Sequence, residues 1–179
     1  MSNVWFTSDT HFNHENLVEF RNEIHGQGRR LFGDVTDMNI RLLENYNKVI
    51  GKRDVVWHLG DVGMGKWDDT LSWLKMLPGL HWNLIPGNHD TDNMRKYVEY
   101  FNKIFGSRKY KGFMMTHIPV HPQELAYRNW PFNVHGHIHH KDKMLPSDKY
   151  FNVNVDVNNL MPVHLDDILA QFNIKHGGE

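Results

Sequence analysis

Short apolar runs that alternate with helix-like segments predict a layered α/β fold for this chain of 179 residues. Apolar residues make up 40% of the sequence and aromatic residues 12%, which is enough to build a packed core. The length is that of one domain, and neither a low-complexity linker nor an internal repeat divides it. We therefore expect a single domain over residues 1–179.

The first half of the chain contains three expected strands and three expected helices. Short apolar runs predict buried strands at residues 4–8, 55–59 and 81–85. Helical spacing of apolar side chains predicts helices at residues 16–24, 37–50 and 67–77, with a loop at 29–35. Asp37 is expected to cap the second helix and Gly51 to end it, while Pro78 and Gly79 stop the third.

The second half is expected to begin with another helix, at residues 93–105, because Met94, Val98, Phe101 and Phe105 share one helical face. Apolar runs predict strands at 112–116 and from 132 to 135. The loop predicted between them, at 119–131, contains three prolines, which suggests a functional rim. Residues 150–157 alternate apolar and polar side chains as a strand does, and the last expected element is a helix at 166–172.

The composition excludes several classes of protein. The formal net charge is -1, whereas a protein that binds nucleic-acid duplexes usually carries a basic excess, so strong duplex binding is not expected. The chain has no cysteine, which leaves His, Asp, Glu, Asn or water as the ligands of any metal. No apolar run approaches the ~20 residues that span a bilayer, and no signal-peptide pattern precedes the first strand. We expect a cytoplasmic protein without a membrane partner.

Residues of the metal-binding and catalytic type follow each of five predicted strands. In chain order, these motifs are Asp9 with His11, Gly60-Asp61, Gly87-Asn88-His89-Asp90, the lone His117, and Gly136-His137-Ile138-His139. The carboxyl ends of strands form the ligand-binding edge of open α/β sheets. The five motifs are therefore expected to converge on one edge, and His14, three residues after His11, is expected to line the same pocket and contact substrate.

Each motif alone has a simpler interpretation. An Asp after a strand is usually a turn residue or a helix cap, and a lone His such as His117 is more often a satisfied polar residue than a ligand. Gly33-Asp34 repeats the dipeptide Gly60-Asp61, but no buried strand precedes it, so we interpret Asp34 as a turn or capping residue. Only the ordered set of five favours a metal site.

The five motifs, in this order, resemble the signature of the calcineurin-like metallophosphoesterase superfamily: Asp-x-His, Gly-Asp, Gly-Asn-His-Asp/Glu, a lone His and Gly-His-x-His. The resemblance covers nearly the whole chain, and the segment from Asn152 to Pro162 is similar to small bacterial and phage members. It implies an α/β/β/α sandwich, in which two mixed sheets flanked by helices carry a dinuclear metal site at one edge.

The resemblance also implies a role for each motif residue. One divalent ion would be held by Asp9, His11 and His139, and the other by Asn88, His117 and His137. Asp61 would bridge them, because a carboxylate has two oxygens and its charge offsets the repulsion between two cations. His89 would protonate the leaving oxygen or bind phosphate, and Asp90 would orient the ring of His89. The N and O ligands indicate Mn²⁺, with Fe, Zn, Ni, Co or Mg as alternatives.

The implied reaction is in-line attack on phosphorus by a hydroxide that bridges the metals, in a phosphodiesterase acting on nucleotide-sized or cyclic nucleotide substrates. Trp130, in the proline-rich loop, is expected to stack on a nucleobase; the alternative is that it pins the loop. A phosphomonoesterase and a catalytically silent scaffold remain alternatives. A protein Ser/Thr phosphatase is disfavoured, because the sequence after Gly60-Asp61 is Val-Gly-Met-Gly rather than Val-Asp-Arg-Gly, and Asp90 replaces Glu. The sequence does not determine the oligomeric state.

Overall fold

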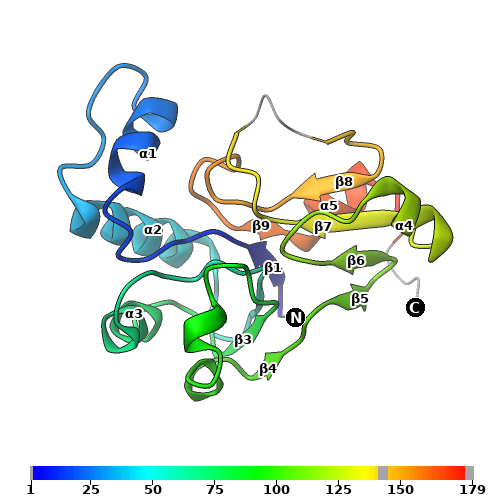
Figure 1. Ribbon diagram of the computed structural model, residues 1–179, viewed down its shortest axis with the longest axis horizontal. Helices are drawn as coiled ribbons and strands as arrows, with labels where there is room; N and C mark the ends of the chain where they lie inside the picture. Colours follow the sequence, from blue (N-terminus) through cyan, green and yellow to red (C-terminus); the bar gives the residue numbers. More distant parts are fainter. Residues whose placement is uncertain (1, 141–144, 176–179) are drawn as a thin grey trace.

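Two mixed β-sheets form the centre of the protein in a computed structural model that describes residues 2–140 and 145–175 (Figure 1). The first sheet has the order β4-β3-β2-β1-β9 and the second the order β5-β6-β7-β8. β1, β2, β3 and β4 are parallel, and β9 is antiparallel to β1. β6, β7 and β8 are parallel, and β5 is antiparallel to β6. The predicted α/β fold of two mixed sheets with helices is confirmed.

The strands are short, and the polar motifs begin directly after several of them. The first sheet contains β1 (Val4–Thr7), β2 (Val55–His58), β3 (His81–Leu84), β4 (Lys103–Ile104) and β9 (Val163–His164). The second contains β5 (Arg108–Tyr110), β6 (Phe113–Met115), β7 (Phe132–His135) and β8 (Tyr150–Asn152). Of these, β4, β5 and β9 were not predicted as strands, since two or three residues carry too little alternation to be recognised.

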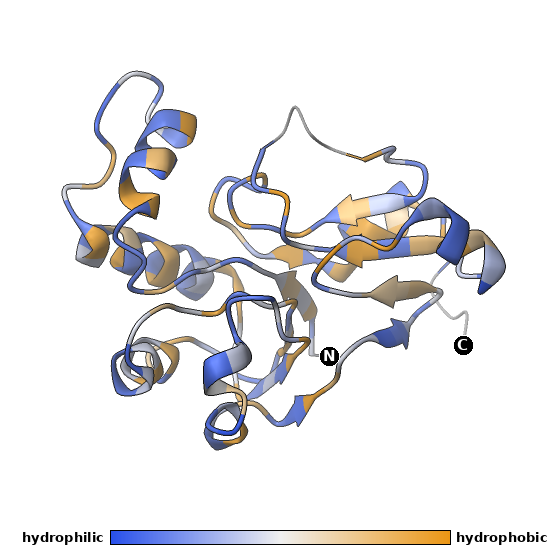
Figure 2. Ribbon diagram, in the orientation of Figure 1, coloured by the Kyte–Doolittle hydropathy of each residue, from blue (hydrophilic) through white to orange (hydrophobic). Residues whose placement is uncertain are grey.

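In the described ranges, five helices accompany the sheets: α1 (Leu17–His25), α2 (Val35–Val49), α3 (Trp67–Leu74), α4 (Pro122–Tyr127) and α5 (Leu165–Gln171). Helix α2 buries Met38, Leu42 and Tyr46 in a core shared with the first sheet. A second core joins both sheets to α5, with Phe6 of β1, Phe113 of β6 and Ile168 of α5 among its members. Figure 2 shows hydrophobic residues concentrated on the strands and on one side of the helices.

The start of α2 differs from the sequence prediction. The N-cap is Asp34 and not Asp37, because the Asp34 side chain accepts a hydrogen bond from the Asp37 N–H at 2.9 Å. The Asp37 side chain accepts one from the Gly33 N–H at 3.0 Å, so the two carboxylates cap the helix reciprocally. The interpretation of Asp34 as a turn or capping residue is confirmed.

The prediction of a helix at residues 93–105 was wrong. This segment forms two 3-10 turns, η1 (Thr91–Asn93) and η2 (Tyr97–Glu99), before β4 pairs with β3. Val98 is 70% exposed while Phe101 is buried, so the apolar residues do not share one buried face. Pairing of Lys103 and Ile104 with the edge of the first sheet fixes the chain more strongly than its helical spacing does.

Three further elements differ from their predicted form or length. The segment 119–131, predicted as a loop, contains α4, which His121 and Pro122 begin. The strand predicted at 150–157 ends at Asn152, beyond which only Asn154 forms an isolated bridge, to Ser8. Helix α3 ends at Leu74, three residues before the predicted end.

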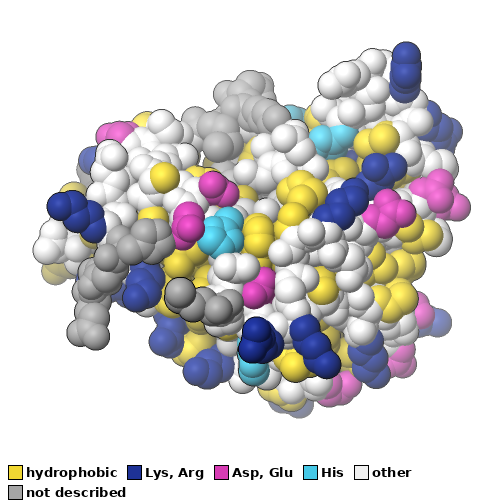
Figure 3. Space-filling model, turned by 180° about the vertical axis from the view of Figure 1, so that it is seen from behind, with side chains coloured by type: hydrophobic (Ala, Val, Ile, Leu, Met, Phe, Trp, Pro, Cys, Tyr) yellow, Lys and Arg dark blue, Asp and Glu magenta, His cyan; other side chains and the backbone are white. Residues whose placement is uncertain are grey.

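Two surface properties bear on possible partners. On the face opposite that of Figure 1, Lys and Arg side chains are interspersed with Asp and Glu, as Figure 3 shows. None of the helices formed by residues 2–140 and 145–175 combines the length and the apolar character needed to cross a membrane.

Candidate metal centre

The segments that follow β1, β2, β6 and β7 are joined by backbone hydrogen bonds at one edge of the two sheets. The Asp9 N–H donates to the Gly60 carbonyl at 2.8 Å, and the His11 N–H to the Asp61 carbonyl at 3.0 Å. Across the second sheet, the Gly136 N–H donates to the His117 carbonyl at 2.9 Å. These bonds join the first motif to the second, and the fourth motif to the fifth.

Two glycines are required where these segments touch. A Cβ atom at Gly87 would collide with the Asp61 side chain and backbone, and one at Gly136 would collide with the side chains of Ser8 and Asp9. Only a residue without a side chain permits such close approach. The glycines of the third and fifth motifs therefore give the carboxylates of the first two motifs the space they occupy.

Four of the motif residues have a left-handed backbone although none is glycine. The φ angles are 58° at Asp9, 46° at His11, 57° at Asp61 and 68° at His137. A non-glycine residue with this conformation is uncommon, and such residues gather at functional sites where the surrounding structure holds them. The backbone is thus bent so that carboxylates and imidazoles face one another.

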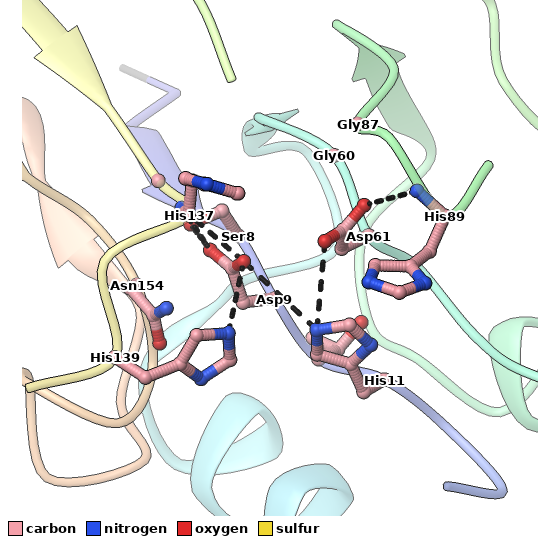
Figure 4. Close-up of polar contacts among 12 residues, drawn as sticks. Ser8, Asp9, His11, Gly60, Asp61, Gly87, His89, His137, His139 and Asn154 are labelled. Atoms are coloured by element: carbon pink, nitrogen blue, oxygen red, sulfur yellow. Dashed lines mark hydrogen bonds and ion pairs between the residues drawn. The ribbon is translucent and has the colours of Figure 1, made fainter. Parts of the chain in front are cut away.

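Asp9, His11 and His139 form what we call the first donor group, whose candidate ligand atoms lie within 4.8 Å of one another. The His139 Nε2 atom is 3.5 Å from Asp9 Oδ1, and His11 Nε2 is 4.0 Å from the same oxygen. Figure 4 shows the three side chains pointing toward a common space. The His137 N–H donates to Asp9 Oδ2 at 3.0 Å, and this bond holds the carboxylate in place.

Asp61, His117 and His137 form the second donor group, again with candidate ligand atoms within 4.8 Å of one another. The His117 Nε2 atom lies 3.3 Å from Asp61 Oδ2 and 3.1 Å from Asn88 Oδ1, so Asn88 borders the same group. Asp61 also reaches the first group, because its Oδ2 is 3.6 Å from His11 Nε2. One carboxylate therefore contacts histidines of both groups.

Two histidines are held in the orientation that a metal ligand needs. The His117 Nδ1 atom lies 2.7 Å from the Leu59 carbonyl, and the His139 Nδ1 atom lies 2.6 Å from Asp156 Oδ2. Each ring can donate from Nδ1, which leaves the Nε2 lone pair directed at the carboxylates. Metal-binding histidines are usually fixed in this way.

Burial is the largest influence on the carboxylates of the centre, and it raises the pKa of Asp9 to about 6. Burial acts on Asp61 too, but the hydrogen bond and charge of His117 outweigh it and bring the pKa of Asp61 well below its ordinary value. At His117, burial is opposed by Asp61 and Asp9, which raise its pKa to about 8. The centre thus favours positive charge between its two carboxylates, which is what a divalent cation provides.

A buried arginine that the sequence analysis did not single out supports the first donor group. Arg21 of α1 is fully buried; its Nε donates to Asp156 Oδ1 at 2.7 Å and its Nη2 to the Asp9 carbonyl at 2.8 Å. The other oxygen of Asp156 contacts His139. The polar positions Asn152, Asn154 and Asp156 were the available signal, since alternating polar residues on a buried segment require partners.

Asp90 lies beneath the second donor group and not beside the ring of His89. Its two oxygens accept hydrogen bonds from the backbone N–H groups of Asp61, Val62 and Gly87 and from the hydroxyl of Tyr97. These four bonds occupy the buried carboxylate, so the expectation that Asp90 orients the His89 ring does not agree with the structure. Asp90 therefore joins the segment after β2 to the segment after β3 through hydrogen bonds.

His89 and His14 lie next to the first donor group. The ring centroids of both are 5.4 Å from that of His11, and the His89 N–H donates to Asp61 Oδ1 at 2.9 Å. The His89 side chain is exposed, so its ring faces the open side of the centre. Burial and then the charge of His89 lower the pKa of His14.

Trp130 was expected to stack on a nucleobase at the metal centre, but it does not lie there. Trp130 immediately precedes β7, whereas His137 follows the end of that strand, so the two residues lie at opposite ends of the sheet. By residue Val120 the chain has already crossed to the far end, where Val120 is hydrogen-bonded to Asn133 and Tyr150. The guanidinium of Arg128 covers the Trp130 ring at 5.9 Å. This contact with a neighbouring residue of the same loop agrees with the alternative that the sequence left open, in which Trp130 pins the loop.

Two mixed sheets with paired carboxylate and imidazole groups at a shared edge are features of two-metal hydrolases. A sequence profile of the calcineurin-like phosphoesterases matches residues 2–178, and the chain belongs to this family. Members of the family hydrolyse phosphoesters with divalent metal ions, and the two donor groups are candidates for holding them.

Several relatives resemble the whole chain. An uncharacterized protein of Methanocaldococcus jannaschii is 35% identical over 176 residues, which are 94% of this chain and 90% of that protein. The gene 66 protein of Mycobacterium phage D29 is 28% identical over 206 residues, with 97% of each chain covered. Among solved structures, a protein of unknown function from Aquifex aeolicus has a TM-score of 0.72 and 28% identity, covering 94% of this chain and 98% of that one.

Proposed function

We propose that this protein is a phosphodiesterase that cleaves nucleotide-sized or cyclic nucleotide substrates at a centre of two divalent metal ions. The observation that carries the proposal is the arrangement of two donor groups around one shared carboxylate, Asp61. Two ions need such a bridge, because without an anion between them their charges repel each other.

The donor set suits two ions of the first transition row. Asp9, His11 and His139 would hold one ion, while Asn88, His117 and His137 would hold the other, with Asp61 shared. All seven side chains offer N or O atoms, for which Mn²⁺ is our choice. When bound, the ions would neutralise charge on the phosphoryl oxygens and lower the pKa of water enough to supply hydroxide at neutral pH.

His89 is proposed to hold a proton for the oxygen that leaves phosphorus. Its backbone N–H is tied to Asp61 at 2.9 Å, so the ring is anchored to the centre, yet it remains open to a ligand. The ring of His14, like that of His89, contacts the ring of His11, and His14 is proposed to contact the substrate. Asp90, clamped by its four hydrogen bonds, contributes by holding Asp61 and the segment of His89 in place.

The preference for diesters is supported by the positions of the arginines. A monoester dianion usually recruits additional fixed cations. The Arg21 guanidinium is engaged by Asp156 and two backbone carbonyls. Arg30 donates to the carbonyls of Phe32 and Gly33, and Arg41 pairs with Glu44. These arginines are therefore engaged elsewhere.

The proposal is tested with one panel under one metal condition. The kcat/KM values for bis(4-nitrophenyl) phosphate, 4-nitrophenyl phosphate, and 2′,3′- and 3′,5′-cyclic nucleotides are compared with Mn²⁺ present. We expect diesters to be cleaved faster than the monoester. A clear preference for the monoester would overturn the diester assignment, while no hydrolysis with any first-row metal would favour the catalytically silent scaffold.

A further inference from the structure

A group of apolar side chains beside the donor groups belongs to neither hydrophobic core. In the described part of the chain, Phe20, Ile24 and Ile138 are absent from both core clusters. Phe20 lies on α1 and is half-buried, and Ile24, one turn further along, is 38% exposed. Large apolar groups next to a polar centre, without a role in packing, mark a surface that binds something.

Phe20 and Ile138 line a groove between α1 and the segment after β7. The groove has a volume of about 470 Å³, and its walls are Leu17, Phe20, His137, Ile138, His139 and His140. The Phe20 ring lies edge-on to the rings of His140 and His139, with centroids 5.0 and 6.0 Å apart. The size is within the range of small-molecule clefts, and the rings match the aromatic lining that such clefts use.

The groove is continuous with the centre. His139 belongs to the first donor group and His137 to the second, so a substituent on phosphorus enters the groove without leaving the donor groups. His89 lies on the other side: Figure 4 shows His11 between His139 and His89. The arm that takes a proton from His89 therefore points away from the groove, and the arm that stays on phosphorus points into it.

We propose that this groove binds an aromatic substituent, a nucleobase or aryl ring, on the arm of the phosphodiester that is retained after hydrolysis. The inference rests on the proposed phosphodiesterase activity. In the reaction a water oxygen bonds to phosphorus, the bond to the leaving oxygen breaks, and that oxygen takes up a proton. The product that keeps the phosphate is the monoester of the aromatic arm, held by stacking on Phe20 and His140.

The test uses three diesters with the same leaving group and different retained arms. They are methyl 4-nitrophenyl phosphate, phenyl 4-nitrophenyl phosphate and thymidine 5′-(4-nitrophenyl phosphate), each assayed by release of nitrophenolate with Mn²⁺. For the unaltered protein we expect kcat/KM to be roughly tenfold higher for the two aromatic arms than for methyl, as stacking of one ring allows. In Phe20→Ala this ratio should fall toward one, and in Phe20→Leu it should fall part of the way.

Tyr127→Ala is the matched control, because Tyr127 is an exposed aromatic residue of α4 at the far end of the sheet, and its ratio should stay that of the unaltered protein. A ratio near one in the unaltered protein, or an equal loss on all three diesters in Phe20→Ala, would refute the groove assignment while leaving the proposed function intact. Failure to cleave even the methyl diester would instead refute the proposed function, and the groove assignment with it. A thermal melt confirms that each variant is folded.

Discussion

The two halves of the centre are held in different ways. In the first donor group, Asp9 and His11 are buried, and the Arg21–Asp156 ion pair fixes Asp9 and His139 through side chains. In the second, His117 is fixed by a backbone carbonyl, while His137 and the neighbouring Asn88 are exposed. The first group is thus preorganised by a buried charge network, whereas the second, although Asp61 and His117 are buried, is open to solvent at His137 and Asn88.

This difference suggests a division of labour. A rigid, buried donor set loses less freedom when it binds an ion, so we expect the first group to bind metal more tightly. The exposed side chains of His137 and Asn88 leave room for substrate oxygens, so we expect the second group to exchange its ion and accept the phosphoryl group. Each of the following variants acts on one half, on both, or on the framework beneath them.

Removal of the shared carboxylate should have the largest effect, because it affects both halves at once. We expect Asp61→Ala to reduce hydrolysis of bis(4-nitrophenyl) phosphate to the level of the chelated protein, with no recovery when Mn²⁺ is added. Metal analysis should find fewer than two ions per chain. Asp69→Ala, at an exposed position of α3, is the control. Near-full activity of Asp61→Ala would contradict the assignment of two metals around this residue.

His89→Ala should act on the chemical step and depend on the leaving group. A proton donor matters most for a poor leaving group, so kcat should fall roughly 10²–10⁴-fold on nucleoside or alkyl esters and much less on nitrophenyl esters. Steady-state kinetics on the two ester types measure the difference. An equal loss on both would make His89 a phosphate-binding group instead.

Asp156→Asn should separate the two halves. An amide has a single acceptor oxygen, so Arg21 and His139 can no longer each have their own, and loss of such a partner for His139 weakens metal binding roughly 10–100-fold. Calorimetric titration with Mn²⁺ should show the tighter site weakened and the other retained. Tyr97→Phe, which removes one of the four hydrogen bonds of Asp90 beneath the second group, is the matched variant for that half. Equal weakening of both sites by Asp156→Asn would contradict the comparison.

Asp156→Asn also leaves the buried Arg21 without its counter-charge, so the free energy of unfolding should fall by roughly 3–5 kcal/mol. Denaturant unfolding of the chelated protein measures this loss separately from metal affinity. Titrations are therefore run at a temperature where the variant is folded, which keeps the two effects apart.

The smallest effect at neutral pH concerns two buried histidines of the framework. Burial lowers the pKa of His58 to about 3 and that of His135 to about 4. Because the unfolded chain binds these protons near pH 6.5, stability is complete above that pH and declines as pH falls from 6.5 toward the folded values. At pH 5.5 each histidine should lower the free energy of unfolding by roughly 1.4 kcal/mol.

Denaturant unfolding in a chelator at pH 7.5 and 5.5 measures this decline. His58→Asn should make the difference between the two pH values smaller, whereas substitution of the exposed His81 should leave it unchanged. An identical difference in His58→Asn and the unaltered protein would show that His58 is not the source.

Much of the centre was predictable from the sequence because its signals are local. A strand is a short apolar run, and each motif directly follows one, so parallel pairing brings Asp9, Asp61 and Asn88 to the same edge. The glycines at 87 and 136 have the same origin, since close approach of neighbouring segments excludes any side chain there. Residue order was therefore enough to predict the fold class and the convergence of the motifs, whereas the division into two donor groups was implied by the resemblance to the phosphoesterase family.

Contacts between distant segments decided the remainder. Arg21 and Asp156 are separated by 135 positions in the chain, and although Asp156 belongs to an alternating polar pattern, nothing local identifies Arg21 as its partner. The same holds for Asp90, whose partners lie on three different segments, and for residues 103–104, whose pairing with β3 overrode a helical pattern. Trp130 was misplaced because it precedes β7 whereas the ligands His137 and His139 follow that strand, which puts them at its opposite ends. Such placements depend on which surfaces pack together. The free energy of that packing is contributed by residues far apart in sequence.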